Sequence, residues 1–183
     1  MGSALAKPTL TPEQFLAWNE SSDLRHEFLS GEVHAMAGAE ERHVTLAGNI
    51  YVALRQHLRG SSFRTYIVDM QLHVGPAEAY FYPDVMVTCS EKDALNTKIK
   101  SEPTLLVEVL SPSTAAYDRG IKFAAYRMLP SLREYLMVDP ETRLCELYRR
   151  TDAGWILHTM EAVQLDSVDF TLDAATLWAE VPL

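Results

Sequence analysis

The chain has 183 residues, of which 48% are hydrophobic and 22% charged, and its formal net charge is −9 at pH 7. This length and composition are sufficient for a sizeable buried core and exclude an intrinsically disordered chain. Twenty-five acidic against sixteen basic residues exclude a protein that coats nucleic acid by general electrostatic attraction. Any contact with nucleic acid must therefore be local or assisted by a metal.

Cysteine usage and hydropathy indicate the compartment. The two cysteines, Cys89 and Cys145, are too few for a disulfide framework and lack the spacing of metal ligands. No apolar run approaches the roughly 18 residues that span a bilayer, and the first residues lack a signal-peptide pattern. We expect a cytoplasmic protein with no membrane contact. Without linkers, repeats or low-complexity segments, we also expect a tail over residues 1–10 and a single domain over 11–183.

The first predicted elements are a short helix and a hairpin. Thr11-Pro12-Glu13-Gln14 combines a capping threonine, a proline at the first helical position and a glutamine that can close a capping box, which predicts a helix to about Asn19. Residues 26–29 and 32–36 then predict two short strands around the turn Ser30-Gly31. Glu27 thereby falls on an early hairpin.

A long amphipathic helix is predicted over residues 41–59, ended by Gly60, with His43 in its first turn. Its expected core-facing stripe is Val44, Ala47, Tyr51, Leu54 and Leu58. Strands are predicted at 63–68, 70–74 and 80–88, with Pro83 at a strand start or bulge, followed by a charged, irregular or briefly helical segment over 91–102.

The segment 104–110 is apolar on both faces except at Glu108, which predicts a central strand covered on two sides. Residues 111–114 begin the next helix, which Pro130 ends. The predicted core stripe of this helix is Tyr117, Ile121, Ala124 and Met128, and the neighbouring face carries Asp118, Lys122 and Tyr126. Strands at 133–138, 144–149 and 155–159 and a short helix near 173–178 complete the predicted order.

Two carboxylates in apolar strands are the residues that point to chemistry. Asp84 heads one such strand, and Glu108 lies inside another. An ionised carboxylate is rarely buried unless it is paired, hydrogen-bonded or bound to a cation. Two carboxylates on neighbouring strands fit Mg²⁺, which takes oxygen ligands together with water and substrate phosphate.

Lys122 is predicted to lie near Glu108. The strand climbs about 10 Å from Glu108 to Ser111 at roughly 3.3 Å per residue. A helix packed back along the sheet descends about 13 Å from Ser113 to Lys122 at roughly 1.5 Å per residue. Because these displacements nearly cancel, a long lysine side chain can reach Glu108, where it can orient or deprotonate water or stabilise negative charge.

Each of these residues also has a purely structural interpretation. Asp84 can bond nearby backbone N–H groups, and Lys122 can form an ordinary surface ion pair with Asp118. A core Glu108 can be tied to an arginine such as Arg64 or Arg127. The remaining structural alternatives are a polar partner on the outer hairpin face for Glu27, solvent exposure for His43 and a helix cap for Ser111.

Several fragments in order resemble a known family. They are R-H-E-F-L-S-G-E, the helix-opening His43, Y-P-D-V, L-L-V-E-V-L-S-P-S-T, D-R-G-I-K and R-E-Y-L-M-V-D-P. This order is similar to that of the Uma-type restriction-endonuclease family within the PD-(D/E)XK nuclease superfamily, over about residues 11–150. The chain departs from the superfamily at Leu110, where the lysine is usual, and from the family at Leu136, which is often Trp.

The resemblance implies an α/β (α+β) fold, a restriction-endonuclease-like mixed β-sheet flanked by helices. It implies an endonuclease that hydrolyses DNA phosphodiester bonds with Mg²⁺ or Mn²⁺ and acts as a homodimer. Carried over by position, Asp84 and Glu108 bind the metal, Lys122 is the catalytic lysine and Glu27 is the N-terminal acid, while His43, Asp118 and Ser111 are motif positions with less defined roles.

Two other functions are compatible with the sequence. One is a non-catalytic dimeric or regulatory module that keeps the nuclease-like scaffold, which the acidic net charge favours because duplex-binding nucleases usually present a basic surface. The other is hydrolysis of a smaller phosphoester or a nucleotide.

Overall fold

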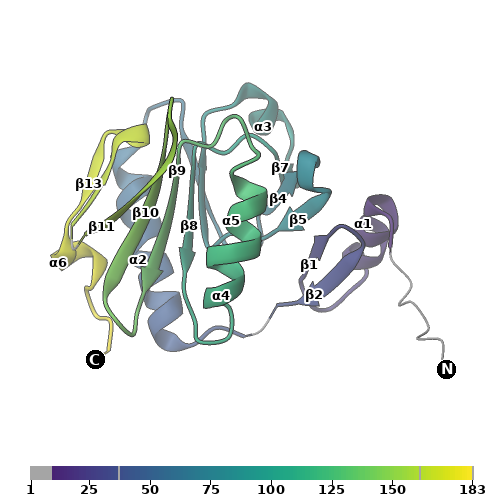
Figure 1. Cartoon of the computed structure of the whole chain (residues 1–183), viewed down its shortest axis with the longest axis horizontal. Coiled ribbons are helices and arrows are strands. Elements are labelled where there is room, and N and C mark those ends of the chain that lie inside the picture. Colours follow the sequence, from purple (N-terminus) through teal and green to yellow (C-terminus); the bar gives the residue numbers. More distant parts are fainter. Residues whose placement is uncertain (1–9, 37, 161, 183) are drawn as a thin grey trace.

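The protein is built around two β-sheets that meet at one edge (Figure 1). The computed structural model describes residues 10–36, 38–160 and 162–182; almost all of the predicted tail over 1–10 thus lies outside the described residues. The larger sheet has six strands in the order β11-β10-β9-β8-β6-β3. These strands are β3 (Arg64–Ile67), β6 (Val85–Thr88), β8 (Leu105–Val109), β9 (Glu134–Asp139), β10 (Leu144–Thr151) and β11 (Gly154–Met160).

Strand β8 lies inside the larger sheet. It pairs antiparallel with β6, where Val85 is opposite Val107, and parallel with β9, where Glu108 is opposite Met137. All five residues of β8 are buried. The predicted central strand is therefore found, and any polar side chain on it must have its partners inside the protein.

The second sheet has five strands in the order β2-β1-β5-β4-β7. Its strands are β1 (His26–Leu29), β2 (Glu32–Ala35), β4 (Gln71–Val74), β5 (Ala79–Phe81) and β7 (Ile99–Lys100). Helix α1 (Pro12–Glu20) packs on β1 through Phe15 and Phe28, whose rings stack at 4.9 Å. The predicted capping box of α1 is present, since Thr11 and Gln14 each bond the other's backbone N–H.

The prediction of one strand over residues 80–88 is wrong. The chain leaves the smaller sheet after Phe81, turns through Tyr82-Pro83-Asp84 and enters the larger sheet at Val85. The chain crosses between the sheets a second time, from β3 in the larger sheet to β4 in the smaller one. This crossing is at Val68 and Asp69, whose φ values are +40° and +55°. Pro83 has no N–H to give to a ladder, so it favours a break in pairing at the first crossing. Asp84 therefore lies where the two sheets diverge.

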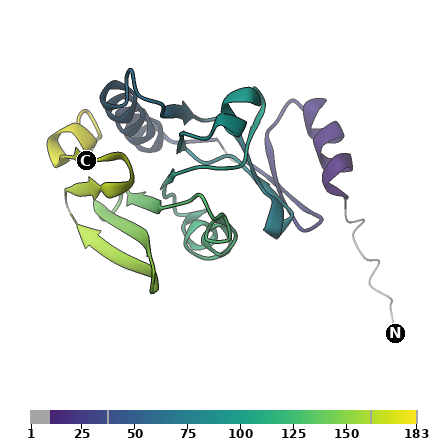
Figure 2. The same ribbon diagram turned by 90° about the horizontal axis from the view of Figure 1, so that it is seen from above.

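Helices cover both faces of the larger sheet (Figure 2). Helix α2 (Glu41–His57) covers one face with Leu46, Ile50 and Leu54. A helical segment over 115–126 covers the other face. It consists of α4 (Ala115–Tyr117), the π-helical turn η2 (Asp118–Lys122) and α5 (Phe123–Tyr126).

Two predicted helix faces need correction. On α2, Val44 is 58% exposed and Ile50 is fully buried, so the core stripe is rotated from the predicted one. On the segment 115–126, Ile121 is exposed and Lys122 is buried, so the polar face and not the apolar stripe faces the sheet. The buried charges on β8 and β1 require polar partners, and this requirement overrides the hydrophobic pattern.

The C-terminal part adds a hairpin that the sequence did not predict, β12 (Val163–Leu165) and β13 (Phe170–Leu172), before α6 (Ala174–Leu177). These elements pack against α2 in the larger core. The remaining short elements are α3 (Glu91–Leu95), η1 (Gly75–Ala77) and η3 (Asp166–Val168). Among the described residues, no helix has the length and apolar character needed to cross a membrane. The two cysteines are both free.

Candidate active site

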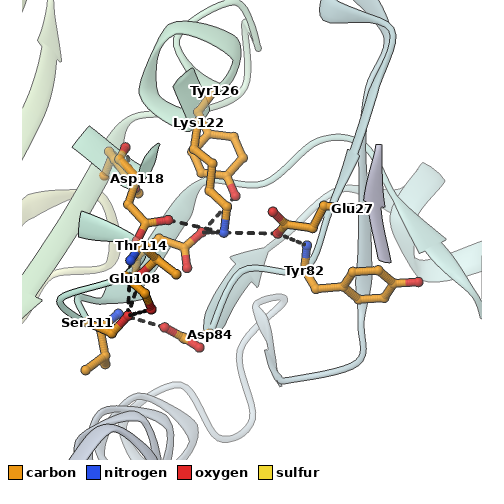
Figure 3. A network of polar contacts seen from close by, with 12 residues as sticks. Glu27, Tyr82, Asp84, Glu108, Ser111, Thr114, Asp118, Lys122 and Tyr126 are labelled. Atoms are coloured by element: carbon orange, nitrogen blue, oxygen red, sulfur yellow. Dashed lines mark hydrogen bonds and ion pairs between the residues drawn. The ribbon is translucent and has the colours of Figure 1, made fainter. Parts of the chain in front are cut away.

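Lys122 is the centre of a buried polar cluster between the two sheets (Figure 3). Its Nζ lies 3.0 Å from Glu27 Oε1, 3.1 Å from Glu108 Oε1 and 3.3 Å from Asp118 Oδ1. The lysine side chain is only 8% exposed. The reach argument placed Lys122 beside Glu108, and the structure has it there.

The π-helical turn determines which side chains of the segment 115–126 point inward. Asp118 and Lys122 are its first and last residues, and both are buried. π-helical turns are rare and are frequently found at functional sites. The Lys122 to Asp118 pair was also considered as an ordinary surface ion pair, but here both side chains are buried and the lysine contacts carboxylates from two sheets.

Glu108 projects from β8 toward this helical segment. Its Oε1 accepts hydrogen bonds from Lys122 Nζ and, at 2.8 Å, from the Tyr126 hydroxyl. Within the described residues, Glu108 Oε2 accepts no hydrogen bond. The alternative in which an arginine pairs with Glu108 is wrong, because a lysine and a tyrosine are its partners.

Glu27 belongs to the other sheet. It lies on β1, is 5% exposed and accepts a hydrogen bond of 3.2 Å from the backbone N–H of Tyr82. The crossing at Tyr82-Pro83-Asp84 therefore holds Glu27 against the cluster. The interpretation of Glu27 as an outer-face residue of the hairpin is not supported by this burial.

Asp84 lies across from Glu108, one residue beyond the paired Val85 and Val107. Its Oδ2 accepts the Val109 N–H at 2.7 Å, and its Oδ1 is 2.8 Å from His43 Nε2. The imidazole comes from the first turn of α2 and is about one-fifth exposed. The structure thus brings together Glu27, Asp84, Glu108, Asp118, Lys122 and His43. Within the described part of the chain, Ser111 makes only local bonds and accepts the Thr114 N–H, while the N-cap of α4 is Thr114.

Burial and charge set the protonation preferences of the cluster. Burial lowers the pKa of Lys122, but the carboxylates of Glu108, Glu27 and Asp118 outweigh this effect and hold its pKa well above the usual value. Burial raises the pKa of Glu108 well above its usual value, against the opposing charge of Lys122. Three carboxyl groups therefore surround the one ammonium group of Lys122, and burial makes the charged form of Glu108 the costly one.

The pKa of His43 is also shifted. Burial lowers it, but the hydrogen bond to Asp84 and the charge of that carboxylate reverse the effect, so the pKa lies above 6.5. His43 donates to Asp84 in its protonated form. The ring fixes the orientation of the Asp84 carboxylate from the α2 side, while Val109 fixes it from the strand side.

The donor set at this place fits a hard divalent cation. Each oxygen of Asp84 accepts one hydrogen bond and each has two lone pairs, so acceptor capacity remains, and Glu108 Oε2 is not used. The excess of carboxylates over cations is neutralised when such an ion binds. Over residues 10–36, 38–160 and 162–182, no three His, Cys, Asp or Glu side chains are grouped as ligands. Two carboxylates with water and phosphate are a set that Mg²⁺ commonly accepts.

Sequence reasoning missed two hydroxyl groups at the site. Tyr126 donates to Glu108, and the hydroxyl of Tyr117 is buried beside the cluster without a hydrogen-bond partner among the described residues. Asp118 Oδ1 also lacks a hydrogen bond, because its contact with Lys122 is an ion pair without hydrogen-bond geometry. Tyr126 had a detectable signal, since it follows Lys122 by four positions on the same helix face. Tyr117 was assigned to the core stripe.

The fold, with a mixed sheet flanked by helices, is that of the restriction-endonuclease-like proteins. The chain belongs to the Uma2 family: its family model, described as "Putative restriction endonuclease", matches residues 12–178. Both the family resemblance and the fold class predicted from the sequence are confirmed.

Relatives cover most of the chain. The Synechocystis sp. proteins slr1290 and sll1609 are each 36% identical to it, over 156 and 151 residues, or 85% and 81% of this chain and 82% and 85% of theirs. The fold is similar to the crystal structure of a "putative nuclease belonging to DUF820" from Anabaena variabilis. The TM-score is 0.80 at 13% identity, over 94% of this chain and 99% of that one.

Proposed function

We propose that the protein is a metal-dependent endonuclease that hydrolyses DNA phosphodiester bonds. The observation that carries this proposal is the convergence of Lys122 with Glu108 and Glu27, beside Asp84 at the entrance to the adjacent strand β6. Membership of a family described as restriction endonucleases supports the same activity.

Asp84 and Glu108 would hold Mg²⁺ or Mn²⁺. A cation bound there supplies neutralisation of the phosphate charge and lowers the pKa of bound water. Lys122 stays protonated because its pKa is raised, so it serves as a hydrogen-bond donor that orients water or stabilises negative charge, and not as the base. Glu27 holds the ammonium group in position, and His43 holds Asp84.

Calorimetric titration with Mn²⁺, alongside a plasmid-cleavage assay, tests this function. Asp84→Asn and Glu108→Gln are expected to abolish both metal binding and cleavage. Asp152→Asn is the matched control, because Asp152 is an exposed carboxylate in the turn between β10 and β11. Unchanged metal binding in both site variants would refute the assignment. Mononucleotide esters assayed in parallel distinguish DNA hydrolysis from that of smaller phosphoesters.

A second candidate function is a non-catalytic module on the same scaffold. The feature that favours it is that Lys122 already neutralises part of the charge of Glu108 in a cluster almost closed to solvent. Wild-type protein that binds neither Mn²⁺ nor DNA, while keeping its fold and its oligomeric state in the site variants, would support this alternative.

A further inference from the structure

A second charged site lies far from the carboxylates. Arg55, Arg59 and Arg64 line a surface hollow of about 260 Å³ where α2 ends and β3 begins. The other residues of the hollow are Leu58, Gly60, Ser61 and Phe63. We call this surface the arginine hollow.

The three arginines have no carboxylate partner among the described residues, although the chain has more acids than bases. Among the described residues, the one side-chain hydrogen bond that these arginines make joins Arg64 Nη1 to the carbonyl of Ser62. Arg55 and Arg59 line the same hollow, where their like charges repel. The helix dipole favours cations at the end of α2, but it does not account for Arg64, which lies on a strand. Three guanidinium groups without carboxylate partners around one hollow are therefore suited to bind an anion.

The local sequence around the arginine hollow carries basic residues without acidic ones. No Asp or Glu occurs between Glu41 and Asp69, so α2 and β3 form a basic unit in a chain with a net charge of −9. This is the local basic surface that an acidic nuclease needs in order to hold a duplex.

Helix α2 connects the arginine hollow to the candidate active site. His43, beside Asp84, lies in its first turn, Arg55 lies in its last turn, and Arg59 follows two residues after its end. At roughly 1.5 Å per residue the separation is about 18 to 24 Å. With a rise of about 3.4 Å per base pair, it corresponds to roughly five to seven base pairs of duplex.

The outer ridge of α2 between these two ends is free. Val44 is 58% exposed, Val52 is 49% exposed, and nothing lies within 4 Å of the Cβ position of Gly48. The C-terminal elements are bound to the other flank, where Asn49 and His57 donate to backbone carbonyls. A phosphodiester backbone can therefore lie along the ridge and end in the arginine hollow.

We propose that the arginine hollow binds backbone phosphates of duplex DNA about half a helical turn from the bond cleaved at Asp84 and Glu108. The proposal deepens the proposed function and rests on it. Guanidinium groups suit this ligand because they bind phosphate oxygens in a bidentate manner.

Fluorescence anisotropy with a labelled duplex of about 20 base pairs, in EDTA and over a series of salt concentrations, tests the proposal. Arg55→Gln, Arg59→Gln and Arg64→Gln are each expected to weaken binding several-fold at about 0.1 M salt and to reduce the salt slope by about one. In the variant with all three substitutions, we expect the losses in affinity and in salt slope to add. The matched control is Arg127→Gln/Arg133→Gln, which removes two exposed arginines from another surface and is expected to bind as wild type.

Wild-type affinity and slope in the triple variant would overturn the proposal, and so would wild-type protein that shows no salt-dependent binding. Inorganic phosphate is titrated separately by calorimetry: no saturable binding at millimolar concentration is expected. Saturable phosphate binding lost in the triple variant, with duplex affinity unchanged, would assign the hollow to a free anion and overturn the DNA assignment. A cleavage assay in Mn²⁺ distinguishes failure of the proposed nuclease activity from failure of the DNA-binding proposal. DNA binding that depends on the arginines but is not followed by cleavage would contradict the nuclease activity and leave the DNA-binding role of the arginine hollow intact.

Discussion

At the scale of single residues, Lys122 is the group whose loss has the largest expected effect. Lys122→Met removes the only cation that contacts Glu27, Glu108 and Asp118 within the described residues. A buried charge left without its partner costs about 3–5 kcal/mol. We expect a loss of this size in the free energy of unfolding, measured by urea denaturation without metal.

The double variant Lys122→Met/Glu108→Gln tests the cause. Because burial disfavours the charged form of Glu108, replacing it with a neutral amide is expected to recover part of the stability lost in Lys122→Met. A double variant as unstable as the sum of both single losses would show that the cluster is not electrostatically coupled.

His43 gives a pH dependence with a definite sign. Its pKa is raised in the folded protein above the ordinary value of 6.5, so folding favours the protonated ring. The stabilisation is fully present below about pH 6.5, the unfolded value, and disappears as the pH rises through the higher folded pKa.

Urea denaturation of wild type and His43→Gln over pH 5 to 9 measures this contribution. We expect the free energy of unfolding of the wild type to exceed that of His43→Gln most at pH 5. This difference is expected to shrink as the pH rises toward 9. A difference that grows with pH would contradict a protonated His43 bound to Asp84.

At the scale of elements, the segment 115–126 shows where sequence patterns fail. Its apolar residues suggested an inward stripe, but Ile121 and Met128 are about half exposed while Asp118 and Lys122 are buried. Hydrophobic periodicity assumes that only apolar residues seek the interior. Here carboxylates from β8 and β1 select the polar face, and that requirement appears only after both sheets are assembled.

Two residues just after the end of this segment test how it packs. Leu129 is 3% exposed and belongs to the core around Tyr126, whereas Met128 is 46% exposed. Leu129→Ala is expected to cost about 2–5 kcal/mol, and Met128→Ala should stay within about 0.5 kcal/mol of wild type. Thermal or urea unfolding measures both. Equal losses in the two variants would indicate that the apolar stripe does face the core.

Other elements could be predicted because their signals are local. The capping box at Thr11 and the Ser30-Gly31 turn depend on residues a few positions apart, and both are present. The crossing at Pro83 could not be located from local pattern, since β5 and β6 are both apolar and only their pairing partners differ. The site residues followed from buried carboxylates and from the family motifs, whereas the hydroxyl of Tyr117 carries no local signal.

At the scale of the whole molecule, net charge and metal binding are connected. The like charges of a chain with a net charge of −9 repel one another, and three of its carboxylates are concentrated around one lysine at the site. A divalent cation bound to the folded form alone stabilises it by about 1.4 kcal/mol for a concentration ten times the dissociation constant. For a chain of this size, that shifts the melting temperature by about 3–5 °C.

We expect Mn²⁺ to raise the melting temperature of wild type by this amount and to leave Asp84→Asn unchanged. A bound cation needs the ionised carboxylate of Glu108, whose pKa is raised by burial, so the shift is expected to grow as the pH rises. Scanning calorimetry at several pH values, with EDTA as the reference and Asp152→Asn as the control carboxylate, measures the effect. A shift of equal size in wild type and Asp84→Asn would mean that Mn²⁺ binds the acidic surface generally, because a cation held between Asp84 and Glu108 cannot stabilise both chains alike.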